Sequence, residues 1–254
     1  MKLSELTLRP PKILLLGEAG TGKTALVTSL GPGLGVVDID EGLLTAATLD
    51  DSFKSKRKGI EVIPSYEDNP SVPTAWTRAE SAIVRIARDC KSGKCDLKAL
   101  CLDSYTTLAD ACLASVMSEH NKLGDAPQIQ HWGETFRRLE SLLATLRSLP
   151  LIVIVIGHIC RIEDANGNIA VEINTPGKKL PQKIPTFFSE IWYMRSVGVG
   201  KKVQRKVYTQ PTPSFPARTR SNVEDGLDAQ LGMVEFLRRC GVDYEAFSYS
   251  GKKS

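Results

Sequence analysis

The feature that most constrains this chain is a glycine-rich segment between two apolar stretches. Residues 12–16 before it are typical of a buried strand, and residues 25–30 after it are typical of the start of a helix. The segment fits G-x-x-x-x-G-K-[ST] and reads Gly17, Glu18, Ala19, Gly20, Thr21, Gly22, Lys23 and Thr24. Glycines there allow backbone N–H groups to surround a phosphate. We therefore predict a phosphate-binding loop (P-loop) that, with Ala25 at the helix start, binds the phosphates of ATP.

A second group of residues is expected to complete the phosphate site. Lys23 has the reach to contact the β- and γ-phosphates, and the Thr24 hydroxyl is a ligand for Mg²⁺. Asp103 follows the apolar run 100–102, so it lies at the end of a predicted strand. A carboxylate in that position holds the water shell of Mg²⁺. ATP and Mg²⁺ are the cofactors that these residues predict.

Composition places the chain among ordinary globular proteins. It has 254 residues, 42% of them hydrophobic, and a formal net charge of +4, which permits an anionic partner without requiring one. Six cysteines form no C-x-x-C pair and three histidines have no ligand spacing, so we expect a reducing, cytoplasmic location and no structural zinc. No apolar run approaches the ~20 residues of a membrane span, so we expect no membrane partner.

Strand-like and helix-like segments alternate along the sequence. Strands are predicted at 12–16, 35–39, 61–63, 98–104, 151–156, 190–196 and 202–209, and helices at 25–30, 74–90, 105–123, 129–149 and 223–240. The last two strands form a hairpin around Gly198 and Gly200, and the loop 161–182 contains a small hairpin around Asn166-Gly167. The pattern predicts an α/β fold with a mostly parallel twisted sheet and helices on both faces. We expect one domain over 1–254, with a core at 10–222 and a C-terminal helical segment at 223–254.

Ligands of parallel α/β sheets bind at the carboxyl ends of the strands. Asp38, Asp40 and Glu41 cluster at the C-terminal end of the second predicted strand, and His158 follows the long apolar strand 151–156. Hydrolysis requires a carboxylate that orients the attacking water, and we favour Glu41 with Asp40 as the alternative. One of these acids could instead cap the next helix. His158 is placed to sense the γ-phosphate, or else it is a buried core histidine.

In this order of motifs the chain resembles the RecA ATPase core. The Walker B strand of RecA-type proteins is followed by Asp-Ser, as in Asp103-Ser104. The chain is also similar to a phage group of RecA-core-only ATPases linked to single-strand annealing recombination, through Gly157-His158 and through the late basic pair Arg218 and Arg220. RecA itself ends the strand that corresponds to 151–156 in Asn-Gln and not in Gly-His. We also expect this chain to lack RecA's accessory domains.

The resemblance implies assembly and a DNA partner. RecA-like cores commonly receive a basic finger from a neighbouring subunit, and Arg218 and Arg220 are the candidates, because no motif places an arginine in the chain's own pocket. The expected assembly is a homo-oligomer, ring or filament, with ATP at the subunit interface. Single-stranded DNA is expected to bind the loop from Arg161 to Lys183. Its basic candidates are Arg161, Lys178, Lys179 and Lys183. A single-strand-binding protein is a further partner, and a phage-encoded protein would act in the host cytoplasm.

Two other functions fit the same P-loop. One is a small-molecule P-loop kinase, although such kinases usually place several arginines in a lid and 161–182 contains only Arg161. The other is a nucleotide-gated binding module with little turnover, which the ambiguous acid at 38–41 leaves open. ATPase measurement with and without single-stranded DNA separates all three functions.

Overall fold

The computed structural model describes residues 9–43, 57–163, 169–177, 179–198 and 200–248. Its strands are β1 (Lys12–Gly17), β2 (Leu34–Asp38), β3 (Glu61–Pro64), β4 (Ala99–Asp103), β5 (Ile152–Gly157), β6 (Ile159–Glu163), β7 (Ile169–Ile173), β8 (Glu190–Val197), β9 (Gln204–Tyr208) and β10 (Leu227–Asp228). The α-helices are α1 (Lys23–Thr28), α4 (Ala75–Lys91), α5 (Tyr105–Glu119), α6 (Ile129–Ser148), α7 (Leu180–Lys183) and α8 (Met233–Arg239). Three short 3₁₀ helices are η2 (Ile184–Phe187), η3 (Gly200–Lys202) and η4 (Ala229–Leu231).

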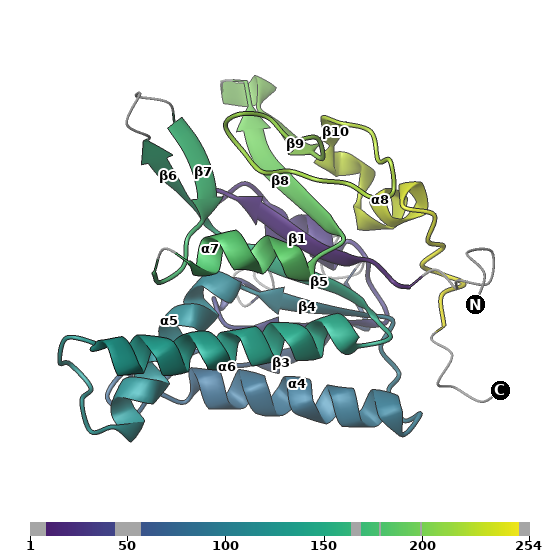
Figure 1. The fold of residues 1–254 in the computed structure, drawn as a ribbon. Coiled ribbons are helices and arrows are strands. Elements are labelled where there is room, and N and C mark those ends of the chain that lie inside the picture. The colour runs from purple at the N-terminus through teal and green to yellow at the C-terminus, as the bar shows by residue number, and fades with distance from the viewer. Residues whose placement is uncertain (1–8, 44–56, 164–168, 178, 199, 249–254) are drawn as a thin grey trace, which may run out of the picture.

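A single eight-stranded sheet forms the centre of the molecule, in the order β10-β9-β8-β1-β5-β4-β2-β3 (Figure 1). The strands from β8 to β3 pair in parallel, and β9 and β10 continue the sheet antiparallel. This confirms the predicted mostly parallel α/β fold. Among the described strands, β6 and β7 pair with no strand but each other, as the predicted small hairpin, and stand out from the main sheet.

Alternate side chains of the strands pack into two separate hydrophobic cores, one on each face of the sheet. Leu14 and Leu16 of β1 point to a core shared with α4, α5 and α6, while Ile13 and Leu15 point to a core shared with α1 and α8. Successive side chains of a strand face opposite sides of a sheet, so a strand buried on both faces is largely apolar, and the ammonium of Lys12 at the start of β1 donates to the carbonyls of Leu149 and Leu151. All six residues of β1 are accordingly buried.

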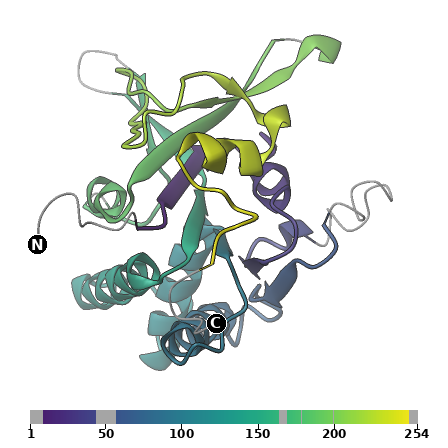
Figure 2. The same ribbon diagram turned by 90° about the vertical axis from the view of Figure 1, so that its right-hand side faces the viewer.

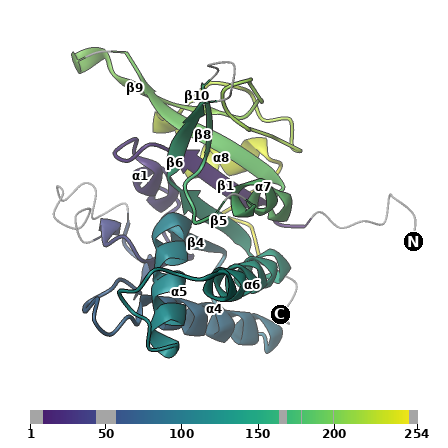
Figure 3. The ribbon, with the colours of Figure 1, turned by 60° about the vertical axis from the view of Figure 1, so that its left-hand side comes forward.

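Different parts of the chain cover the two faces. Figure 3 shows α4, α5 and α6 gathered into one layer, in which all three helices contact one another. The C-terminal segment covers the other face beside α1 (Figure 2), with Phe236, Leu237 and Tyr244 buried there. The helix predicted over 223–240 was wrong in extent. Its first half forms β10 and η4, and Gly232, with φ 78°, precedes the shorter α8.

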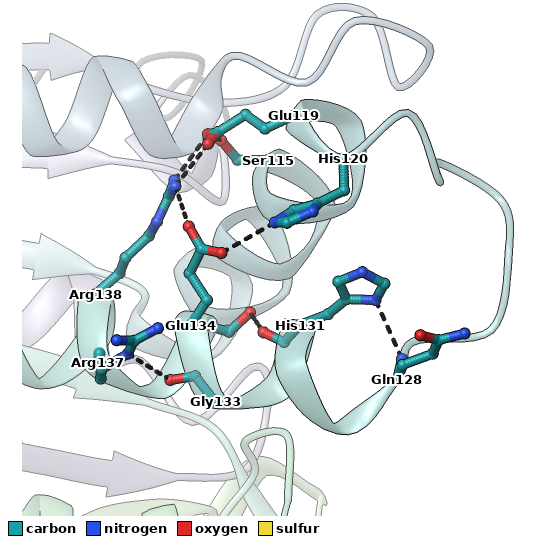
Figure 4. A network of polar contacts seen from close by, with 10 residues as sticks. Ser115, Glu119, His120, Gln128, His131, Gly133, Glu134, Arg137 and Arg138 are labelled. Atoms are coloured by element: carbon teal, nitrogen blue, oxygen red, sulfur yellow. Dashed lines mark hydrogen bonds and ion pairs between the residues drawn. The ribbon is translucent and has the colours of Figure 1, made fainter.

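A polar network joins α5 to α6 at the outer surface of the helical layer (Figure 4). The guanidinium of Arg138 donates to both carboxylate oxygens of Glu119, at 2.7 and 2.6 Å, and to Glu134 at 2.6 Å. The other oxygen of Glu134 lies 3.1 Å from Nε2 of His120. One arginine therefore bridges acids from two helices, and the bidentate geometry is the strong form of this contact.

We expect Arg138→Gln to lower the free energy of unfolding by about 1 kcal/mol, because it removes two ion pairs that are only partly exposed. Arg137→Gln is the matched control, since the contact that Figure 4 draws for Arg137 is with the Gly133 carbonyl of its own helix. Urea denaturation at low and high salt measures both variants. The Arg138 effect should shrink with salt, and equal losses in the two variants would contradict the assignment.

Candidate nucleotide-binding site

The P-loop joins β1 to α1 at the carboxyl edge of the sheet. A Cβ built on Gly17 would lie 2.4 Å from the Met194 carbonyl oxygen, so the loop begins where only glycine fits against β8. Gly22 has φ 94° and forms the N-cap of α1. This left-handed backbone is costly for any other residue type. Both glycines of the motif are thus required by the fold as well as by a phosphate ligand.

The Lys23 ammonium lies inside this loop. Its Nζ donates to the carbonyl oxygens of Gly17 at 2.9 Å and Glu18 at 2.8 Å, and the residue is 4% exposed. Burial lowers the pKa of Lys23 to about 8, while the nearby carboxylates of Asp103 and Asp40 oppose this shift. A buried cation with weak acceptors gains from an anionic ligand, because phosphate oxygens offer charge-assisted hydrogen bonds.

Thr24 and Asp103 meet across the sheet edge. The Thr24 hydroxyl donates to Oδ2 of Asp103 at 2.7 Å, and Asp103 is 3% exposed. Burial raises the pKa of Asp103 to about 6, against the opposing effect of the Thr24 hydrogen bond. Mg²⁺ usually takes one or two protein oxygens together with substrate phosphates. This pair of oxygens beside the P-loop fits that requirement, and no cluster of three His, Cys, Asp or Glu residues suited to a metal occurs in the described part of the chain.

The three acids at the C-terminal end of β2 take three different positions. Asp38 is 2% exposed and accepts from the backbone N–H groups of Gly42 and Leu43, at 3.2 and 3.3 Å. It therefore stabilises the turn that follows β2. Glu41 has φ 55° and an exposed side chain. Asp40 is the acid that the backbone turns into the site.

Asp40 joins β2 to the ends of two other strands. Its Oδ1 accepts from the Ser104 hydroxyl at 3.0 Å, and its Oδ2 lies 3.0 Å from Nε2 of His158. Burial alone would raise the pKa of Asp40, but hydrogen bonds from His158, Thr107 and Ser104 outweigh it and hold the pKa below its ordinary value. The carboxylate thus stays ionised next to the P-loop, as a residue that orients water must.

His158 is positioned by the strand between the P-loop strand and the Asp103 strand. β5 pairs with β1 on one side and with β4 on the other, and His158 follows it directly. The His158 backbone N–H donates to the Thr106 hydroxyl at 3.0 Å. The side chain is 30% exposed and faces Asp40, so it belongs to the site and not to the core.

The basic residues predicted for the loop after β5 do not form one cluster. Arg161 lies on β6 and forms an exposed ion pair with Glu18 of the P-loop at 2.7 Å. Lys183 pairs at 2.6 Å with Glu140, midway along α6, and Lys179 is exposed at the start of α7. Lys178 lies outside the described residues. Of these residues, only Arg161 is brought into contact with the P-loop.

Arg218 and Arg220 lie near the opposite end of the sheet. The Arg218 backbone pairs with Ile191 at the start of β8, and its guanidinium donates to the carbonyls of Pro185 and Phe188 at 2.9 and 2.7 Å. Arg220 has an exposed side chain, and its backbone N–H donates to the buried carboxylate of Glu190 at 2.9 Å. Neither arginine contacts the P-loop of its own subunit.

Sequence reasoning missed Arg205. No sequence motif placed an arginine in the chain's own pocket, but β9 brings the Arg205 side chain beside Gly22 of the P-loop. The Cδ, Nε and Cζ atoms of Arg205 lie 3.1, 3.3 and 3.5 Å from the position of a Cβ on Gly22. The signal was present in the sequence, since the predicted hairpin 190–209 carries Arg205. Its register, which sets the face of each side chain, could not be read from the sequence.

One protein family matches most of the chain. A family described as an AAA domain matches residues 9–221. No curated protein matches the sequence. Among solved structures, a KaiC-like protein from the hyperthermophilic archaeon Pyrococcus horikoshii OT3 is 12% identical, with a TM-score of 0.43 over 87% of this chain and 84% of that chain. In the described residues no helix has the length and apolarity needed to cross a lipid bilayer. On the family match, the chain belongs to the AAA domain family of P-loop ATPases.

Proposed function

We propose that this protein is a Mg²⁺-dependent ATPase that acts on single-stranded DNA in recombination or strand annealing. The observation that carries the proposal is the convergence of Lys23, the Thr24–Asp103 pair and the Asp40–His158 pair at one sheet edge. The resemblance to phage RecA-core ATPases supports the DNA substrate. The net charge of +4 is compatible with that partner, and a cytoplasmic location is part of the proposal.

Each residue of the edge has a defined task in ATP hydrolysis. Lys23 binds phosphate oxygens and exchanges its two carbonyl partners for them. Thr24 and Asp103 would hold Mg²⁺, which supplies positive charge against the phosphate oxygens. Asp40 orients the attacking water, and His158 keeps Asp40 ionised and fixed in direction. The proposed catalytic acid is therefore Asp40, the alternative to Glu41, because Asp40 contacts His158 and Ser104.

The β6–β7 hairpin supports a coupling between DNA and ATP. It leaves the sheet directly after His158, and its Arg161 is tied to Glu18 of the P-loop. A DNA phosphate that takes Arg161 from Glu18 would release a P-loop side chain, because one guanidinium fork cannot serve both anions fully. DNA binding at this hairpin would then be felt at the nucleotide site.

ATP turnover measured with and without single-stranded DNA tests this function. We expect Mg²⁺-dependent hydrolysis that DNA stimulates, and loss of turnover in Lys23→Ala and in Asp103→Ala. Hydrolysis in the Lys23→Ala protein at the wild-type rate would contradict the proposal. Tight ATP binding without turnover would favour the nucleotide-gated binding module, and turnover that requires a small phosphate acceptor would favour a kinase.

A charge-reversal variant, measured in the same turnover assay, tests where single-stranded DNA binds. Lys179→Glu should weaken single-stranded DNA binding and DNA-stimulated turnover together, with basal turnover unchanged. Binding should also fall steeply with salt, because phosphate contacts release counterions. Lys58→Glu makes the same change at another exposed turn and is the control. A larger effect from Lys58 would place the DNA elsewhere.

The two candidate acids are separated by isosteric amides. Asp40→Asn should retain ATP binding and lose turnover by roughly 10²–10⁴-fold, the usual contribution of a general base. Glu41→Gln should remain close to wild type, because its side chain is exposed and turned from the site. Steady-state turnover and equilibrium ATP binding measure both. The reverse ranking would restore Glu41 as the catalytic acid.

We also propose assembly into a ring or filament in which a neighbouring subunit supplies an arginine to the ATP site. Arg220 is the better candidate, because Arg218 is held by two carbonyls of its own subunit. A cation supplied in this way would offset charge on the transferred phosphoryl group. Arg220→Ala and Lys23→Ala proteins should each be inactive, and mixing them should restore part of the ATPase activity. No recovery over a wide range of mixing ratios would argue against a shared site.

A further inference from the structure

A cavity on the far side of the P-loop has no task in the function proposed above. It has a volume of about 400 Å³ and lies between α1, the β8–β9 hairpin and η4. Ala25 and Ser29 form one wall, Val203 and Arg205 a second, and Ala229 and Gln230 a third. The third wall lies beyond residues 9–221, the part of the chain that matches the AAA domain family.

The geometry of the phosphate site indicates which end of a bound nucleotide would face this cavity. In the sheet, β5 and β4 lie on one side of β1, and β8 and β9 lie on the other. His158 and Asp103 follow or end the first two strands, so the γ-phosphate end of a bound nucleotide belongs on that side. The other end of the nucleotide must then leave the P-loop toward β8 and β9, where the cavity begins at Gly22.

We propose that this cavity binds the base and ribose of the nucleotide, with the Arg205 guanidinium against the base. The inference rests on the proposed binding of ATP and adds the residues that hold its nucleoside part. The volume lies within the usual range of small-ligand pockets, roughly 300–1,000 Å³. A planar guanidinium stacks on aromatic rings, and stacking of this kind suits a purine.

The register of the hairpin directs Arg205 into the cavity. Arg205 pairs with Ser196, and Val207 pairs with Met194. Val207 and Met194 are buried in the core that contains α1, so Arg205, two residues from Val207, faces the same side. Its guanidinium carbon lies 3.5 Å from the Cβ position of Gly22, which places the cation directly beside the P-loop.

The remaining walls suit a nucleoside. Val203 is 45% exposed and offers an apolar surface that a base would cover. Gln230 has an amide that both donates and accepts hydrogen bonds, as the edge of a base requires. The start of α8, directly after η4, is tied to the end of α1, because the Met233 backbone N–H donates to the hydroxyl of Ser29, the C-cap residue of α1, at 2.7 Å. The cavity is therefore a built feature of the fold.

Arg205→Gln tests the assignment, with ATP and inorganic tripolyphosphate as ligands in titration calorimetry. We expect ATP affinity to fall about tenfold or more, the scale of a lost contact to a charged group. Tripolyphosphate affinity should change by less than about twofold, because that ligand has no nucleoside. Arg195→Gln is the matched control: Arg195 pairs with Lys206 on the same hairpin and faces the opposite side of the sheet.

The outcomes separate this inference from the proposed function. Unchanged ATP affinity in Arg205→Gln, or equal losses for ATP and tripolyphosphate, would overturn the nucleoside site while leaving ATP binding in place. A wild-type protein that binds neither ligand would overturn both. Photolabelling of the wild type with 8-azido-ATP, which does not depend on any variant folding, should modify residues of the hairpin or η4. Labelling confined to other segments would also overturn the assignment.

Discussion

The site depends on the parallel pairing of β1 with β5 and of β5 with β4. Parallel strands end at the same edge of a sheet, so this pairing brings Thr24, Asp103 and His158 together although they are far apart in the chain. The hydrogen bond from Thr24 to Asp103 joins residues 79 positions apart. This hydrogen bond depends on the register of β1 and β4. Both strands are buried on both faces and cannot shift in register without exposing apolar side chains.

The buried charges at this edge of the sheet compensate one another. Lys23, Asp103 and Asp40 are all largely buried, and each is costly as an isolated charge. Burial moves the pKa values of Lys23 and Asp103 toward neutrality, to about 8 and about 6. A polyphosphate with Mg²⁺ would supply the missing counter-charges. Asp40 is different, because His158 and Ser104 already stabilise its ionised form.

The C-terminal segment has a larger part in the site than a terminal helix would have. Phe236 and Leu237 of α8 lie in the same buried cluster as Leu26 and Val27 of α1, and η4, next to α8, lines a cavity together with α1. The β8–β9 hairpin arrives from the other direction and brings Arg205 over Gly22. Two elements that contribute nothing to the phosphate motif thus border it, because α1 is short and its outer face needs a cover.

The sequence by itself determined the α/β class, the phosphate loop from Gly17 to Thr24 and the strand-end positions of Asp103 and His158. These depend on local spacing and on apolar periodicity, which a sequence displays directly. Only the tertiary structure showed that Asp40 contacts Ser104 and His158 while Glu41, at φ 55°, has an exposed side chain. It also decided the place of Arg205 and the shortened α8. Hairpin register and the packing of a short terminal segment depend on contacts distant in sequence, and no local pattern encodes them.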